Sequence, residues 1–218
     1  MVNKLSSKVL TFHGTTEMED AFSYTAADIN GHSPTTGGGK WNAFYSPESV
    51  ISVDGTKALI NTAGGKPGSG GAIALYPFTP KKNMLYALVV TLDYLKLPGV
   101  SSMGGFGFAA GDHGEKANPW MIVRAQNSEG GDSGIIGFCD DPEREAGGWV
   151  AYAAFYPTIT GVITLNTKTN QVDYYINNIL QGGVIVSPPK INYLFFKNQN
   201  TGDALAIKNI KLLSQPAP

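Results

Sequence analysis

The residues best suited to chemistry in this sequence are aromatic side chains, one of which shares a strand face with an arginine. Trp120 and Arg124 stand four residues apart, so the alternation of side chains along a strand puts both on one face. An unpaired arginine is unfavourable in an apolar core, so this face is expected to reach solvent or a groove. Aromatic platforms beside polar groups are typical of sugar-binding sites. Further candidates for such a site are Trp149, Tyr152, Tyr156 and His113.

The same pair also has an interpretation that needs no ligand. Trp120 then lies half buried near the end of a sheet, and Arg124 extends across the surface with its charge in water. Trp41 and Trp149, each beside glycines, are also typical of residues that anchor a segment by burial. Both interpretations stay open from the sequence.

Carboxylates are present, but their spacing does not indicate a catalytic pair. A retaining glycosidase needs two carboxyl groups about 5–5.5 Å apart. The dense acidic run from Asp140 to Glu145 contains Pro142 and precedes Gly147-Gly148, which favours a solvated loop. Glu17 and Glu19 also alternate, and we expect them on an exposed edge.

Histidine and cysteine give no clearer catalytic signal. Cys139 precedes Asp140-Asp141, whose negative charge disfavours a reactive thiolate, so a buried or bystander thiol is expected. The segment Gly111–Glu115 holds three side chains that could bind a metal, but their spacing fits no strong zinc signature. No nucleophile elbow is present, and the histidines are scattered: His13, His32 and His113.

The composition limits the classes of partner. The 16 Lys and Arg residues nearly balance the 17 Asp and Glu residues, for a net charge of −1. A nucleic-acid surface needs a basic stripe, so no nucleic-acid partner is expected. Charged residues make up only 15% of the chain, and the 27 glycines and 13 prolines favour an all-β protein with many turns.

The elements that must position these side chains are short strands around one central strand. The apolar run Leu85–Asp93 is rich in β-forming residues and too short for a membrane helix, which needs about 20 apolar residues. Both of its alternating faces are apolar, so both are expected to be covered. About a dozen strands with frequent turn signals predict a β-sandwich or jelly roll. Asp54-Gly55 and the segment Asn166–Asn170 predict two of the hairpins.

The order of these features resembles the concanavalin A-like or laminin-G-like jelly-roll family of bacterial surface proteins and phage tail or decoration proteins. The resemblance covers Phe22 to Leu212. It rests on the loop Ile29–Trp41, the strand Leu85–Asp93 and the hairpin from Asn166 to Asn177. It implies an all-β, two-sheet antiparallel jelly-roll sandwich. The motifs fix strand order and turns, and they carry no chemistry.

The resemblance implies several functions. The first expectation is a non-catalytic, lectin-like domain that binds glycan on a concave sheet face. The alternative is a structural or assembly module, such as a virion decoration or tail protein or a surface adhesin. The third is a polysaccharide hydrolase or lyase, for which Arg124, Gln126 and His113 form an incomplete set. Family members also hold structural calcium between the terminal strands, and Asp20 and Asp203 are the acids nearest those places. Hydrophilic loop tips are the other interpretation of these acids.

The remaining expectations concern organisation and location. Residues 1–218 are predicted to form a single jelly-roll domain, with an ordered core at about 9–213, a short N-terminal arm and a Pro-rich tail. No signal peptide is recognisable at the N-terminus as given. The resemblance implies an extracellular, cell-surface or virion location, a glycan or another surface or virion protein as partner, and no membrane insertion.

Overall fold

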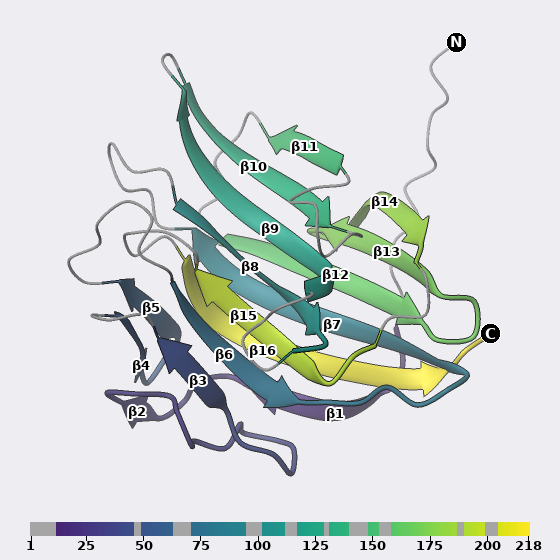
Figure 1. Ribbon diagram of the computed structural model, residues 1–218, viewed down its shortest axis with the longest axis horizontal. Coiled ribbons are helices and arrows are strands. Elements are labelled where there is room, and N and C mark those ends of the chain that lie inside the picture. Colours follow the sequence, from purple (N-terminus) through teal and green to yellow (C-terminus); the bar gives the residue numbers. More distant parts are fainter. Residues whose placement is uncertain are drawn as a thin grey trace.

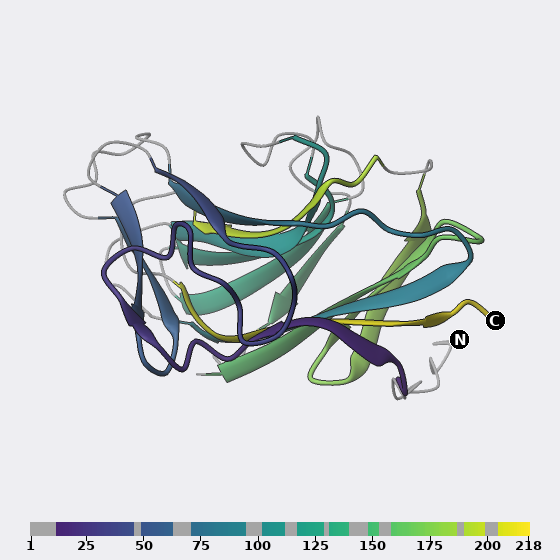
Figure 2. The same cartoon turned by 90° about the horizontal axis from the view of Figure 1, so that it is seen from below.

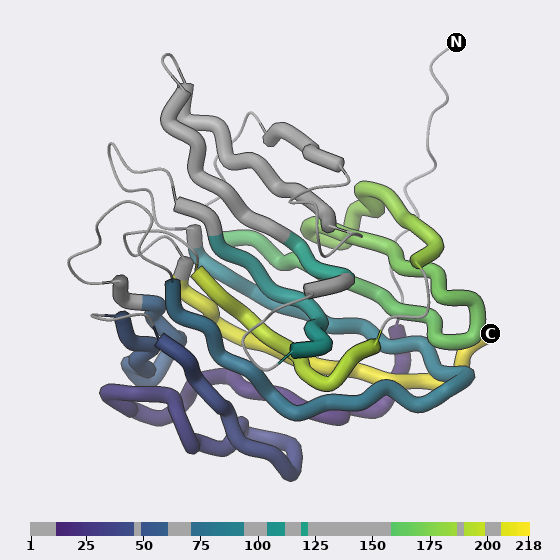
Figure 3. The backbone as a smooth tube through the Cα atoms, viewed as in Figure 1, coloured from purple at the N-terminus to yellow at the C-terminus, as the bar shows by residue number. Residues whose placement is uncertain are grey.

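The computed structural model of the protein describes ten segments of the chain. Figure 3 draws in grey the residues whose placement is uncertain. They are residues 12–45, 49–62, 71–94, 102–111, 117–128, 131–139, 148–152, 158–186, 190–198 and 205–218. For residues 61–62, 94, 102–103, 117–118, 122–128, 131–139, 148–152 and 205, the description covers the backbone alone.

In the described residues, sixteen strands form two antiparallel sheets that stack as two layers (Figures 1 and 2), and no helix is present there. The predicted two-sheet antiparallel sandwich is therefore confirmed. The first sheet has nine strands. In spatial order they are β14 (Ile179–Ile185), β13 (Gln171–Ile176), β12 (Thr158–Asn166), β7 (Met84–Tyr94), β16 (Leu205–Pro216), β5 (Ala58–Thr62), β4 (Ser49–Asp54) and β2 (Thr25–Ala26), and β1 (Thr15–Asp20) also pairs with β16.

The second sheet has seven strands. In spatial order they are β11 (Gly148–Tyr152), β10 (Gly131–Cys139), β9 (Ala117–Ser128), β8 (Ser102–Ala109), β15 (Tyr193–Asn198), β6 (Ala72–Pro77) and β3 (Asn42–Tyr45). No described residue belongs to a helix that is long and apolar enough to cross a membrane.

Strand β7 lies inside the nine-stranded sheet, between β12 and β16, as its two apolar faces predict. Tyr86, Leu88, Val90 and Leu92 point into the core between the sheets and are almost fully buried. On the other face, Ala87 is fully buried in a smaller apolar cluster that also contains the half-buried Val89. The inner face is therefore covered by the opposite sheet, whereas on the outer face Ala87 is buried and Leu85, Val89 and Thr91 are half buried.

The segment between β1 and β3 closes one end of the core around Trp41. Its indole is fully buried and contacts the rings of Phe22, Tyr76 and Phe196 at centroid distances of 6.5, 5.7 and 5.2 Å. The prediction that Trp41 anchors this loop by burial is confirmed. Phe22 adopts a φ of 51°, a left-handed value that turns the chain away from β1.

The predicted hairpins are confirmed, and one further hairpin was missed. Gly55 has a φ of 94° between β4 and β5, and the Asp54 carboxylate accepts hydrogen bonds from the backbone N–H groups of Thr56 and Lys57. Asn177 and Asn178 have φ values of 48° and 67° between β13 and β14. Two successive positive φ values are typical of a type I′ turn, whose twist matches a two-residue hairpin.

Candidate functional site

The outer face of the seven-stranded sheet carries an apolar and aromatic surface separate from the core. Side chains that alternate with the core residues of β6, β8, β9 and β15 gather there, away from the other sheet. We call this surface the outer aromatic face. Its described members are Phe44, Ile73, Leu75, Ala109, Trp120, Tyr193 and Phe195, with Lys197 above them.

The strand register arranges this face in rows. Phe195 pairs with Leu75 of β6 and Gly107 of β8, and Gly107 pairs in turn with Trp120 of β9. A Cβ atom at Gly107 would lie 2.5 Å from the carbonyl oxygen of Pro119 and from the Cβ of Trp120. Glycine is therefore required at this position of β8, where a side chain would collide with β9.

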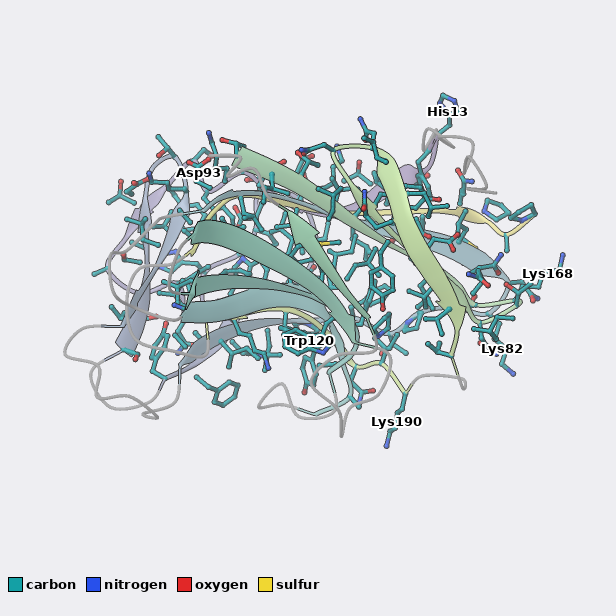
Figure 4. The ribbon with its side chains drawn as sticks, turned by 90° about the horizontal axis from the view of Figure 1, so that it is seen from above. His13, Lys82, Asp93, Trp120, Lys168 and Lys190 are labelled. Atoms are coloured by element: carbon teal, nitrogen blue, oxygen red, sulfur yellow. The ribbon has the colours of Figure 1, made fainter. Side chains whose placement is uncertain are left out.

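Trp120 faces outward but is covered. Only 6% of the residue is exposed, its ring centroid is 6.1 Å from that of Phe195, and the Lys197 Nζ lies 4.4 Å from the indole centroid. The prediction that Trp120 shares an outward face is consistent with this position. It is more buried than the half-buried interpretation expects, because Phe195 and Lys197 lie against it. Figure 4 shows Trp120 on the same side of the molecule as Lys190, opposite His13 and Asp93.

The other predicted sugar-binding residues are placed only in part. Arg124 lies on β9, where it pairs with Ile135 of β10, and the structure describes its backbone alone. Trp149 and Tyr152 lie on β11, paired with Gly137 and Gly134. For Trp149 and Tyr152, too, the structure describes the backbone alone. His113 and Tyr156, and the acidic run of residues 140–145, lie outside the described residues, so their roles stay predictions.

Sequence reasoning missed the side chains that β15 adds to this face. Tyr193, Phe195 and Lys197 alternate with Leu194 and Phe196, which point into the core. This alternation was visible in the sequence. The position of β15 beside β8, however, follows from a long-range pairing that no local pattern reveals.

Asp20, the predicted calcium ligand, instead organises the loop around Trp41. It is fully buried; one carboxylate oxygen accepts a hydrogen bond from the Phe22 N–H at 2.9 Å. The other oxygen accepts from the Trp41 Nε1–H at 2.7 Å and from the Tyr24 hydroxyl at 3.2 Å. Burial raises the pKa of Asp20, against the opposing effect of these hydrogen bonds. Burial and the nearby Asp20 raise the pKa of Tyr24, so its hydroxyl stays a donor.

This arrangement does not fit a calcium ligand. Calcium takes six to eight oxygen ligands, whereas the oxygens of Asp20 are occupied by neutral donors. Asp203 lies outside the described residues, and the described part of the chain contains no group of three or more side chains that could hold a metal ion. We therefore derive no function from a metal at Asp20.

The alternating acids of β1 are tied to β16. Glu19 forms an ion pair with Lys211 at 3.1 Å and accepts a hydrogen bond from Asn209 at 3.3 Å. Glu17 is exposed and accepts a hydrogen bond from the Ser214 hydroxyl. The predicted exposed edge describes Glu17. Glu19 is half buried, and its backbone exchanges hydrogen bonds of 3.0 and 2.8 Å with Thr36 on the side of β1 away from β16.

Comparison with known proteins identifies the fold. The structure matches the carbohydrate recognition domain of Emp47p with a TM-score of 0.55 and 11% identity, over 90% of this chain and 96% of that one. It matches the CBM2 module of the evolved Dit protein of Lactobacillus casei BL23 phage J-1 with a TM-score of 0.56 and 10% identity, over 91% and 96%.

A third neighbour is the potassium-bound carbohydrate recognition domain of Emp46p, with a TM-score of 0.53 and 12% identity over 79% of this chain and 88% of that one. No family model and no curated protein matches the sequence. At these identities the structural matches establish the architecture alone. With its two antiparallel sheets, the chain has the concanavalin-like β-sandwich fold.

Proposed function

We propose that this chain is a non-catalytic, lectin-like domain that binds glycan on the outer aromatic face of its seven-stranded sheet. The observation that carries the proposal is the cluster of Trp120, Phe195 and Tyr193 on a sheet face turned away from the core. The fold neighbours support it, because they include carbohydrate recognition domains and a phage carbohydrate-binding module.

Within this proposal the aromatic residues have different roles in binding. Tyr193 and Phe44 are half buried, so each keeps an exposed surface on which a sugar ring can stack. Trp120 and Phe195 are buried and support that surface from below. Arg124 and Trp149 extend the proposed site, because the register aligns Trp149 with Gly137 and Ile122, two positions along β9 from Trp120. Tyr152 is in register with Gly134 and Ala125, five positions from Trp120 and therefore on the opposite face of the sheet. Tyr156 and His113 stay candidates from the sequence.

The test is a glycan array followed by calorimetric titration of the best ligand. Tyr193→Ala should weaken binding by about tenfold or more, since stacking contributes on the order of 1 kcal/mol or more. Ile185→Ala is the matched control, because Ile185 is 72% exposed on β14 of the other sheet. Absence of binding across plant, algal and bacterial glycans would overturn the proposal. Release of reducing ends or unsaturated uronates would replace it with an enzyme.

An extracellular, cell-surface or virion location follows from this proposal, since that is where a glycan-binding domain of this kind meets its ligand. The neighbours, which include a module of a phage protein, support such a location.

A structural or assembly role is the second candidate, and strand β14 favours it. This strand ends the nine-stranded sheet, and on the described residues it pairs with β13 alone. Ile179 and Ile185 are 56% and 72% exposed on it, and β14 contains no charged residue. Edge strands in soluble proteins are usually protected by charges or proline. The partner proposed for this edge is β14 of a second copy of the chain.

The assembly candidate is tested by light scattering after size-exclusion chromatography. A dimer that Ile179→Lys and Ile185→Lys convert to a monomer would support it, because a charge disfavours edge pairing. A monomer at all concentrations in the unmodified protein would overturn it.

A further inference from the structure

We propose that the outer aromatic face binds an oligosaccharide of at least two sugar units along a strip that crosses β15, β6 and β3, and that Asn42 binds its hydroxyl groups. This inference rests on the proposed carbohydrate-binding function. The ligand is an oligosaccharide in which one ring stacks on Tyr193 and a neighbouring unit presents two adjacent hydroxyl groups to Asn42.

Burial confines a ligand to one part of the face. The members that form its floor are each at most 8% exposed: Ile73, Leu75, Ala109, Trp120 and Phe195. Among the side chains that the structure describes, those with more accessible surface lie on β15, β6 and β3, which are neighbours at one edge of the sheet (Figure 1). Pro77 and Asn42 are exposed, and Tyr193 and Phe44 are half buried.

The strand register places these accessible residues in a continuous strip. Tyr193 of β15 is opposite Pro77 of β6, and Asn42 of β3 is opposite Leu75, two positions along β6 from Pro77. Strands are about 4.8 Å apart and rise about 3.4 Å per residue, so the Cα atoms of Tyr193 and Asn42 are separated by about 12 Å. That separation exceeds the width of one sugar ring, so the strip fits two or more units.

Asn42 has a position that the fold itself does not use. Its neighbours Ala43 and Tyr45 pack toward the core between the sheets, whereas Phe44 belongs to the outer aromatic face. The alternation therefore directs Asn42 to the same face as Phe44. Its side-chain amide has no hydrogen-bond partner in the described part of the chain. Asparagine is also depleted in strands, so strand propensity does not account for it.

An amide matches a pair of sugar hydroxyl groups. Its NH₂ group donates and its carbonyl oxygen accepts, so one asparagine can bond to two adjacent hydroxyls at once. Pro77 and Tyr193 present apolar ring surfaces that suit the C–H face of a sugar. An apolar surface with a few placed polar groups is typical of small-molecule sites.

The alternative is that Asn42 only keeps the edge of the sheet in water. Strand β3 ends the seven-stranded sheet on this side, and edge strands need protection from pairing with other chains. In that case removal of the amide leaves glycan binding unchanged. Asn42→Leu tests this directly, because leucine keeps the size of the side chain and removes its donors and acceptor.

The experiment begins with a glycan array, which identifies the glycan that binds most strongly. Calorimetry then measures binding of its monosaccharide, disaccharide and tetrasaccharide fragments, and of disaccharide derivatives that each lack one hydroxyl group. The variants are Asn42→Ala and Asn42→Leu. Gln181→Ala is the matched control, because Gln181 carries an amide on β14 of the other sheet. Thermal unfolding verifies that each variant is folded.

Both Asn42 variants should weaken binding of the disaccharide and tetrasaccharide about fivefold or more, as expected for lost hydrogen bonds, whereas Gln181→Ala should not. In Asn42→Ala, removal of the hydroxyls that Asn42 contacts should have no further effect. The monosaccharide should bind more weakly than either longer fragment.

A monosaccharide that binds as tightly as the tetrasaccharide, or full affinity in either Asn42 variant, would overturn this inference while the carbohydrate function stands. Absence of binding to every glycan on the array would overturn both.

Discussion

The indole nitrogen of Trp41 donates a 2.7 Å hydrogen bond to the fully buried carboxylate of Asp20. This contact joins the end of β1 to the end of the loop that returns to β3. The same carboxylate accepts hydrogen bonds from the Phe22 N–H and the Tyr24 hydroxyl. One ionisable side chain thus satisfies three donors in a region that water does not reach.

The first prediction concerns the acceptor capacity of Asp20. Asp20→Asn should destabilise the fold by about 1–3 kcal/mol, because an amide has one acceptor oxygen and its NH₂ group must face a buried donor. Urea unfolding measures the loss. In a Trp41→Phe background the Asn substitution should cost less, since the indole donor is gone. Equal costs in the two backgrounds would show that the hydrogen bond between Asp20 and Trp41 is energetically unimportant.

The second prediction gives the pH dependence that Asp20 adds to stability. Burial raises its pKa in the folded state above the usual 3.8. The folded protein therefore holds this proton more tightly than the unfolded chain does, so the contribution of Asp20 is fully present below pH 3.8 and is lost as pH rises through the folded pKa. The cost of Asp20→Asn should accordingly be larger at acidic than at neutral pH. A cost that grows with pH would mean that hydrogen bonding outweighs burial and lowers the pKa.

The third prediction concerns the glycine-rich loop that precedes Trp41. A Cβ atom at Gly39 would lie 2.8 and 2.9 Å from two carbons of the Tyr76 ring, whereas one at Gly38 would meet nothing within 4 Å. Gly39→Ala should destabilise by about 1–3 kcal/mol, because the loop or the buried ring must move. Gly38→Ala should change stability by less than about 0.5 kcal/mol. Thermal unfolding of the two variants checks the pair, and equal losses would contradict the assigned contact.

Sequence patterns predicted the fold wherever they act locally. The alternating apolar run of β7 indicated a covered strand, and Asp54-Gly55 supplied both the side-chain acceptor and the positive φ that a tight turn needs. Strand β14 escaped prediction because Gly182-Gly183 weakens its pattern. The hairpin turn before β14 is formed by Asn177-Asn178. Both residues adopt positive φ values there without a glycine.

The candidate site was only partly predictable, because it is assembled across strands that are distant in the sequence. The alternation of β9 placed Trp120 on an outward face. Its cover comes from Phe195 and Lys197 of β15. Strand β8 lies between β9 and β15, and its Gly107, in register with both Trp120 and Phe195, has no side chain that would keep their rings apart. Asp20 was assigned to calcium because an acid near a terminal strand suits a cation. The donors that occupy it instead come from the intervening loop.

The last prediction tests how tightly the two sheets pack. Gly161 of β12 faces the opposite sheet, and a Cβ atom there would lie 2.7 Å from Phe106 and 2.8 Å from the sulfur of Met121. Gly161→Ala should therefore overpack the core and cost about 1–3 kcal/mol, measured by urea unfolding. Gly182→Ala on β14 is the matched control, because its Cβ would meet nothing within 4 Å. Met121→Ala should relieve part of the Gly161→Ala penalty in the double variant, since it removes one of the two side chains that the new methyl group would meet. A neutral Gly161→Ala would show that the sheets separate easily at this point and that the glycine is not needed for their contact.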